Sequence, residues 1–188
     1  SYPGFDFDAI NISSEQVGGD YFDFIPIVDH QLGITIADVS GKGLPASLIM
    51  ASYRASLIAE IRNNYAIRTI MRKVNNLIFE SVERGNFVTA VYGVLDTRNR
   101  VFTFSNAGHN PPFILRKSGE VESLTDGGLI LGIVPERQYL ERPVQFGSGD
   151  IMVMYTDGVT DTENDKGDQF DIERLVELVR KNRQLSAE

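Results

Sequence analysis

The sequence contains no cysteine and only two histidines among its 188 residues. The absence of cysteine excludes disulfide bonds, thiolate metal sites and catalysis by a cysteine nucleophile. No run of lysine or arginine interrupts the excess of acidic residues, 26 against 18 basic ones, so a nucleic-acid partner is not expected. No apolar run approaches the roughly 18 residues of a membrane span, and the first residues lack a signal-peptide pattern. We therefore expect a cytoplasmic protein with no nucleic-acid partner and no membrane partner.

The rest of the composition is that of a globular chain, with 42% hydrophobic and 23% charged residues. The length fits one domain, which we predict to span residues 1–188. Because the chain opens with Ser1 rather than Met, we expect it to be a fragment of a longer protein. The net charge of −8 is compatible with solubility alone or with carboxylates clustered around cations.

Alternation of apolar and polar residues predicts several β-strands joined by short turns. Residues 5–13 are expected to form one half-buried strand, and residues 21–28 and 32–39 a hairpin around a solvent-exposed His30. Pro26 places its strand at a sheet edge or a bulge. After Gly85 the strand pattern returns in a run of hairpins that ends with "DIMVMYTDG".

Three helices are predicted, beginning at Pro45, near residue 66 and near Asp171. The second is expected to bury a stripe of apolar residues: Ile67, Ile70, Met71, Val74, Leu77 and Ile78. Hairpin-linked strands with helices grouped separately predict an α+β fold, in which helices pack outside antiparallel sheets.

The segment "IADVSGKGLPAS", residues 36–47, matches the dinucleotide-binding pattern G-x-G-x-x-A through Gly41, Gly43 and Ala46. A dinucleotide fold would require a second parallel strand after the helix, ending in an acidic residue. A second helix occupies that place in this chain. We therefore interpret the turn as a device that presents Asp38 at the end of its strand.

Aspartates gather at the ends of apolar segments. Asp20 and Asp23 lie in "VGGDYFD", Asp38 ends "LGITIAD", and Asp157 and Asp161 lie in "MVMYTDGVTD". Burying such carboxylates is costly unless a cation or hydrogen-bond donors compensate them. Three separate segments with this pattern predict a shared Mg²⁺ or Mn²⁺ site, because those ions prefer oxygen ligands. Two alternatives remain: Asp23 on the solvent face of its strand, and Asp38 as a cap or turn residue.

His109, in "NAGHNPP", has two interpretations. It could be a general acid that protonates the serine leaving group. It could instead be a loop histidine whose ring hydrogen-bonds the backbone and fixes the two prolines that follow. We favour the structural interpretation.

Six segments together resemble the bacterial SpoIIE/RsbU-like branch of the PPM (type 2C-related) metal-dependent serine/threonine protein phosphatases. They are "VGGDYFDF", "IADVSGKGLPASLIMA", "FVTAVYGVLD", "SNAGHNPPFIL", "LGI" and "GDIMVMYTDGVTDTEN", and their order and spacing match that family. The resemblance implies a two-sheet antiparallel β-sandwich flanked by helices. It also implies that the chain lacks the family's last strand, whose Asp-Asp-x-Thr motif completes the metal centre.

The resemblance further implies a centre of two Mn²⁺ or Mg²⁺ ions. Asp20, Asp38 and Asp157 match the catalytic metal-site aspartates, with Asp38 as the bridge between the metals, and the backbone carbonyl of Val39 matches a further ligand. Three glycines are expected to shape the loops around the site: Gly19, Gly41 and Gly158.

The activity implied by the resemblance is hydrolysis of phosphoserine or phosphothreonine by a metal-bridged hydroxide. The expected substrate is a phosphorylated regulatory protein, an anti-sigma factor antagonist, in a stress-response partner switch. An upstream sensor domain or protein is implied, and a homodimer is compatible with this role. The alternative is a non-catalytic module of the same fold that binds a partner or dimerises.

Overall fold

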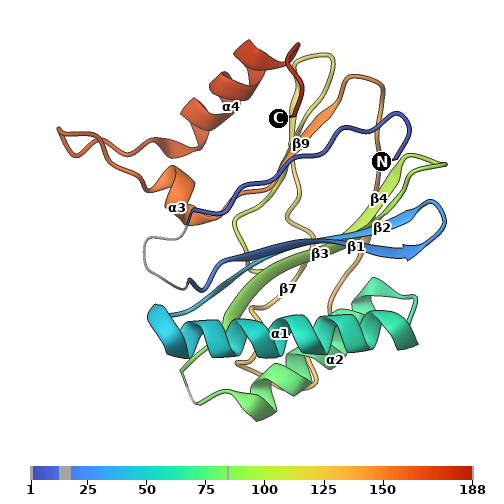
Figure 1. Cartoon of the computed structure of the whole chain (residues 1–188), viewed down its shortest axis with the longest axis vertical. Helices are drawn as coiled ribbons and strands as arrows, with labels where there is room; N and C mark the ends of the chain where they lie inside the picture. Colours follow the sequence, from blue (N-terminus) through green and yellow to red (C-terminus); the bar gives the residue numbers. More distant parts are fainter. Residues whose placement is uncertain (1, 13–17, 84, 188) are drawn as a thin grey trace.

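The computed structural model describes residues 2–12, 18–83 and 85–187. Two β-sheets face each other and helices pack on the outside (Figure 1). All strand pairs are antiparallel except the short pair formed by β7 (Gly127–Gly128) and β4 (Val101–Ala107). The predicted α+β sandwich with flanking helices is confirmed.

The larger sheet is built from long hairpins. Its strand order is β1-β2-β3-β4-β7, with β8 paired to β4. The remaining strands of this sheet are β1 (Tyr21–Val28), β2 (Gln31–Val39), β3 (Val88–Asp96) and β8 (Arg142–Gln145). Pro26 lies on the edge strand beside a register shift, and His30 is exposed in the turn, both as predicted.

Two helices cover the outer face of this sheet: α1 (Gly43–Asn63) and α2 (Ile67–Ser81) (Figure 1). Their apolar residues form one buried cluster with side chains of β2 and β3. The predicted stripe of α2 is buried except for Leu77, which is 39% exposed. The helix starts fall within two residues of the predicted positions.

The smaller sheet has the order β6-β5-β9. Its strands are β5 (Phe113–Leu115), β6 (Val121–Ser123) and β9 (Ile151–Val153). The four-residue α3 (Asp157–Thr160) follows β9, and α4 (Asp171–Asn182) packs on the outside of the sheet. The third predicted helix is therefore confirmed as α4.

The strand predicted at residues 5–13 is wrong for the part that the structure describes. Residues 5–12 belong to no strand, and residue 13 lies outside the described residues. Aromatic contacts hold the segment in place: Phe7 stacks edge-on against Phe24 of β1, with ring centroids 5.7 Å apart. The segment does alternate apolar and polar residues. Its apolar side chains pack against the larger sheet, but the backbone of residues 5–12 forms no hydrogen-bonded ladder.

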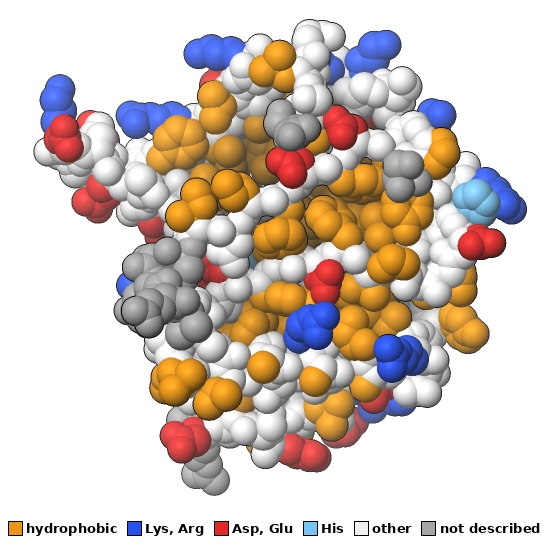
Figure 2. All heavy atoms as spheres, viewed as in Figure 1, with side chains coloured by type: hydrophobic (Ala, Val, Ile, Leu, Met, Phe, Trp, Pro, Cys, Tyr) orange, Lys and Arg blue, Asp and Glu red, His pale blue; other side chains and the backbone are white. Residues whose placement is uncertain are grey.

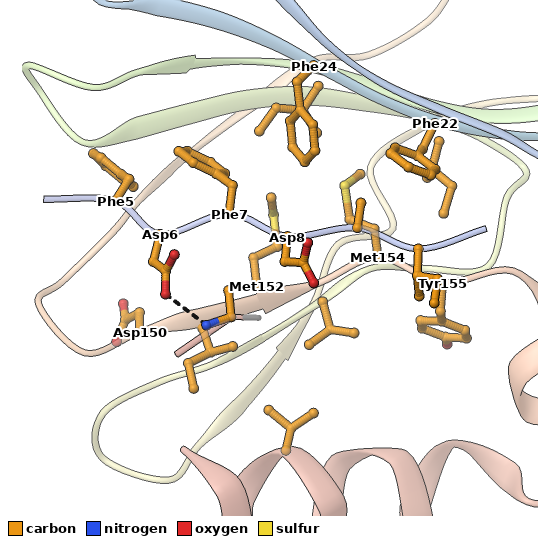
Figure 3. Close-up of a pocket in the computed structure, with 18 of the residues that line it drawn as sticks. Phe5, Asp6, Phe7, Asp8, Phe22, Phe24, Asp150, Met152, Met154 and Tyr155 are labelled. Carbon is orange, nitrogen blue, oxygen red and sulfur yellow. Dashed lines mark hydrogen bonds between the residues drawn. The ribbon is translucent and has the colours of Figure 1, made fainter. Parts of the chain in front are cut away.

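A large, mostly apolar cleft is lined by this N-terminal segment together with side chains of both sheets. Its volume is about 1030 Å³, and it extends to the ends of Asp20 and Thr156. Figure 2 shows the hollow, with hydrophobic side chains gathered in it. Figure 3 shows aromatic and methionine side chains from both sides of the cleft: Phe5, Phe7, Phe22, Phe24, Met152 and Met154. No helix among the described residues is both long and apolar enough to cross a membrane.

Candidate metal centre

Asp38 lies at the end of β2, where the loop containing Asp20 crosses it. A Cβ atom added to Gly19 would lie 3.1 Å from the Val39 carbonyl oxygen and 3.4 Å from Asp38 Oδ1. A side chain at position 19 would therefore crowd the Val39 carbonyl. Gly41 has a φ of 98°, a left-handed conformation that favours glycine, just after Val39. Gly19 and Gly41 thus shape this loop pair as predicted, whereas a Cβ at Gly158 would meet only Thr156 at 3.8 Å.

The Asp38 carboxyl is in an unfavourable environment for a negative charge. Its pKa is raised to about 7, first by burial, then by the negative charges of Asp20 and Asp157 and by a hydrogen bond with Asp20. The Val39 N–H opposes this shift by donating to the carboxylate. Among the described residues, no lysine or arginine pairs with any of the three aspartates. Within the part of the chain that the structure describes, the three carboxylates therefore lack a basic partner.

This donor set fits a hard divalent cation. Carboxylate and carbonyl oxygens are the ligands that Mg²⁺ and Mn²⁺ prefer, and a cation would relieve the repulsion at Asp38. Within residues 2–12, 18–83 and 85–187, however, no three His, Asp or Glu side chains are grouped closely enough to hold a metal by themselves. Asp20 and Asp38 are in hydrogen-bond contact, while Asp157 acts on Asp38 by its charge. Further oxygen ligands, such as the Val39 carbonyl or water, would complete a site.

Asp157 lies in the segment that follows the smaller sheet. It is the first residue of α3 and is exposed to solvent. The preceding residue, Thr156, donates a hydrogen bond from Oγ1 to Asp20 Oδ2 at 3.2 Å. On the other side, Ser47 of α1 donates from Oγ to the Gly18 carbonyl at 3.1 Å. The Asp20 loop is therefore held from both layers.

Two candidate aspartates lie apart from this group. Asp23 accepts a hydrogen bond from the Tyr21 hydroxyl at 2.6 Å, and the Arg54 guanidinium of α1 lies 3.7 Å from the same oxygen. Asp161 is exposed and accepts from Thr160 Oγ1 at 3.3 Å. Neither carboxyl is among the groups that act on Asp38.

His109 is almost fully buried, at 4% exposure, between the two sheets. Its Nε2 lies 3.1 Å from the Tyr155 carbonyl oxygen and its Nδ1 lies 2.9 Å from Thr89 Oγ1. Burial lowers the pKa of His109 to about 4, against the opposing effects of the Tyr155 carbonyl and the Asp157 charge. The ring is neutral near pH 7, and both nitrogens are engaged. This geometry favours the structural interpretation, although the ring bonds Tyr155 rather than the two prolines.

The supporting residues were not identified from the sequence: Ser47, Thr89, Asn106 and Thr156. One signal was available, because Asn106 precedes His109 by three residues, the spacing at which a side-chain oxygen can accept from a backbone N–H. Asn106 Oδ1 accepts from His109 N at 2.8 Å in this way. The other contacts join distant segments, so no local pattern predicts them.

Comparison with known proteins places the chain among bacterial phosphatase domains. The family model described as stage II sporulation protein E (SpoIIE) matches residues 28–188. The phosphoserine phosphatase RsbU of Bacillus subtilis (strain 168) is 30% identical over 175 residues, which cover 92% of this chain and 52% of RsbU. The chain thus spans about half the length of that relative.

Solved structures agree on the fold. The SiaA-PP2C domain of Pseudomonas aeruginosa superposes with a TM-score of 0.78 at 19% identity, covering 90% of this chain and 68% of that one. The crystal structure of the RsbU and RsbW domains of Rv1364c from Mycobacterium tuberculosis gives a TM-score of 0.70 at 24% identity, covering 81% of this chain and 43% of that one. At these identities the likeness establishes the sandwich architecture.

Proposed function

The chain belongs to the SpoIIE family of PPM-type phosphatase domains, and from this we propose that it hydrolyses phosphoserine or phosphothreonine in a regulatory protein with the help of Mn²⁺ or Mg²⁺. The observation that carries the proposal is the set of carboxylates around Asp38, which repel one another and have no basic partner among the described residues. A pair of divalent cations would neutralise these carboxylates, and the repulsion between them would be replaced by attraction to the metals.

Each residue of the group has a proposed role. Asp20 and Asp38 would hold the cations, Asp157 would complete the set from the other sheet, and the Val39 carbonyl would add a neutral oxygen. When bound, the cations would lower the pKa of a coordinated water molecule. They would also supply positive charge that stabilises the phosphoryl oxygens. The Thr156 hydroxyl would orient the Asp20 carboxylate by donating to its Oδ2 oxygen.

The residues present favour direct attack by water over a covalent intermediate. The chain has no cysteine to serve as a nucleophile. His109 is neutral, and its Nε2 faces a backbone carbonyl, so it is poorly placed to protonate a leaving group at neutral pH.

We further propose that residues 1–188 form one phosphatase domain of a longer regulatory protein. RsbU is a phosphoserine phosphatase, and Rv1364c joins an RsbU domain to an RsbW domain in one chain. By analogy, the substrate would be a phosphorylated regulator such as an anti-sigma factor antagonist, and a sensor would act upstream. A homodimer would suit this arrangement.

The test is release of phosphate from a phosphoserine peptide with and without Mn²⁺. Wild-type protein extended through the family's last strand is expected to show Mn²⁺-dependent release. Asp38→Ala should reduce that release at least about 100-fold, since loss of even an outer partner of a metal costs 10- to 100-fold. Asp23→Asn is the matched control, because Asp23 pairs with Tyr21 and Arg54 instead of joining the group. Equal release by the wild type and Asp38→Ala would refute the mechanism.

The alternative is a partner-binding or dimerising module that has kept the fold without catalysis. It predicts a folded wild-type protein that releases no phosphate at any Mn²⁺ concentration even when the family's last strand is included. The presence of Asp20, Asp38 and Asp157 together speaks against this alternative.

A further inference from the structure

We infer that His109 is a positioning residue for the metal centre: its ring, with a proton on Nε2, ties β3 to the segment that follows β9 and fixes Asp157 relative to Asp38. The inference rests on the proposed function, because the spacing of the two aspartates matters chemically only if they act on the same cations.

The hydrogen-bond partners determine which ring nitrogen carries the proton. The Tyr155 carbonyl oxygen can only accept, so Nε2, 3.1 Å away, must be the donor. In a neutral ring Nδ1 is then an acceptor, and the Thr89 hydroxyl, 2.9 Å away, donates to it. The Thr89 hydroxyl has one proton, so its 3.4 Å contact with the Asp38 carbonyl is the weaker of its two options.

The two partners of the ring lie beside the two aspartates. Thr89 of β3 is the register partner of Asp38 on β2. Tyr155 follows β9 and precedes Asp157 by two residues. One ring therefore connects the backbone next to Asp38 in the larger sheet with the backbone next to Asp157 in the smaller one.

The loop that carries His109 is itself firmly held. Asn106, 4% exposed, accepts from His109 N at 2.8 Å and donates to the His109 carbonyl at 3.1 Å and to the Leu124 carbonyl at 3.2 Å. A Cβ added to Gly108 would lie 2.4 Å from Ile130 Cγ2, and Gly108 has a φ of 69°. A buried ring on such a firmly held loop can fix the position of one sheet relative to the other, because it is bonded to both.

The first experiment reads the tautomer. Long-range ¹H–¹⁵N NMR spectra of the metal-free chain distinguish a protonated from an unprotonated ring nitrogen. His30→Asn simplifies the assignment, because it leaves His109 as the only histidine and asparagine tolerates the φ of 65° at position 30. We expect a proton on Nε2 and a bare Nδ1. A proton on Nδ1 with a bare Nε2 would overturn the inference.

The second experiment separates positioning from plain stability by measuring Mn²⁺ affinity and thermal unfolding together. Thr89→Val removes the donor to Nδ1 with little change of shape. Thr103→Val is the matched control on β4, where the half-buried hydroxyl makes no hydrogen bond among the described residues. We expect Thr89→Val to weaken Mn²⁺ binding about tenfold and Thr103→Val to leave it within about twofold, both as folded proteins.

Substitutions of His109 complete the set. His109→Leu should weaken Mn²⁺ binding at least as much as Thr89→Val. His109→Gln, whose amide can still donate to the Tyr155 carbonyl, should restore much of the affinity. A folded His109→Leu chain with Mn²⁺ affinity within about twofold of wild type would overturn the inference.

Two other outcomes would also overturn the positioning role of His109. If His109→Leu does not fold, equal affinities of Thr89→Val and Thr103→Val overturn the inference by themselves. If the wild-type protein extended through the family's last strand binds no Mn²⁺ while the NMR spectrum shows the Nε2 proton, the link exists but the metal centre does not. That result refutes the metal-dependent function, and the positioning role with it.

Discussion

The two sheets of the sandwich differ in how completely they are paired and covered. In the larger sheet, β2 and β3 are nine residues each and pair along their whole length. Two helices, α1 and α2, seal one of its faces into a continuous core. In the smaller sheet, β5, β6 and β9 are three residues each, and Leu175, still 9% exposed, is the one buried residue of α4.

The candidate site spans this difference. Asp38 ends a strand that is fixed by a long hydrogen-bond ladder, whereas Asp157 begins a four-residue helix after a three-residue strand. Side-chain contacts across the layers, from His109 to Tyr155 and from Thr156 to Asp20, must supply the precision that the smaller sheet lacks. The larger sheet therefore holds Asp38 rigidly, whereas the position of Asp157 depends on a few hydrogen bonds between the layers.

A matched pair of core substitutions tests this difference in rigidity and should give the largest effect. Leu57 of α1 and Leu115 of β5 are both 0% exposed, so Leu→Ala removes the same atoms from the two layers. We expect the free energy of unfolding to fall by about 4–5 kcal/mol for Leu57→Ala and about 2–3 kcal/mol for Leu115→Ala. The short strands and α4 can move to fill the space at Leu115, while the helix-covered core cannot. Urea denaturation measures the free energy of unfolding of both variants. Equal losses would contradict the proposed difference in rigidity between the two layers.

The two layers also contain carboxyl groups whose pKa values shift in opposite directions. The pKa of Asp38 is about 7, raised from an ordinary value of 3.8. Between pH 4 and 7 the folded chain therefore binds more protons than the unfolded chain, and the stability of the metal-free protein falls as pH rises through that window. Asp38→Asn should flatten this fall, by about 1–2 kcal/mol in total, because solvent at the half-exposed group screens part of the repulsion.

Asp150, between β8 and β9, should behave in the opposite way. Burial alone would raise its pKa, but hydrogen bonds from Gly147 N–H, Arg116 and Lys117 N–H outweigh burial and lower it. The stability it contributes is present above its ordinary pKa and is lost as pH falls toward the folded value. Asp150→Asn should therefore destabilise the chain at pH 7 and matter less in acid. Thermal unfolding in a chelator, followed against pH, measures both variants; slopes of the same sign would contradict the assignment.

Much of the fold follows from local patterns. The hairpin of β1 and β2, the edge position of Pro26 and the apolar stripe of α2 were all predicted, because each depends on periodicity or on one backbone rule. Asp38 at a strand end was also predicted, since an apolar run that stops at an aspartate marks that position.

The remainder depends on contacts between distant segments. Residues 5–12 alternate like a strand, yet only the arrangement of neighbouring elements decides whether a ladder partner is present. Thr89, His109 and Tyr155 are separated by 20 and 46 residues along the chain, and no spacing rule joins them. The sequence could propose the aspartates, but it could not predict the hydrogen bonds between the segments that carry them.

The aspartates around Asp38 are proposed to form a divalent-cation site, and calorimetric titration with Mn²⁺ of the metal-free protein, extended through the family's last strand, is the sharpest test. We predict saturable binding by the wild type and at least about 100-fold weaker binding by Asp38→Asn, with Asp23→Asn within about twofold of wild type. No saturable heat from the folded wild-type chain, or equal affinities for wild type and Asp38→Asn, would contradict the claim.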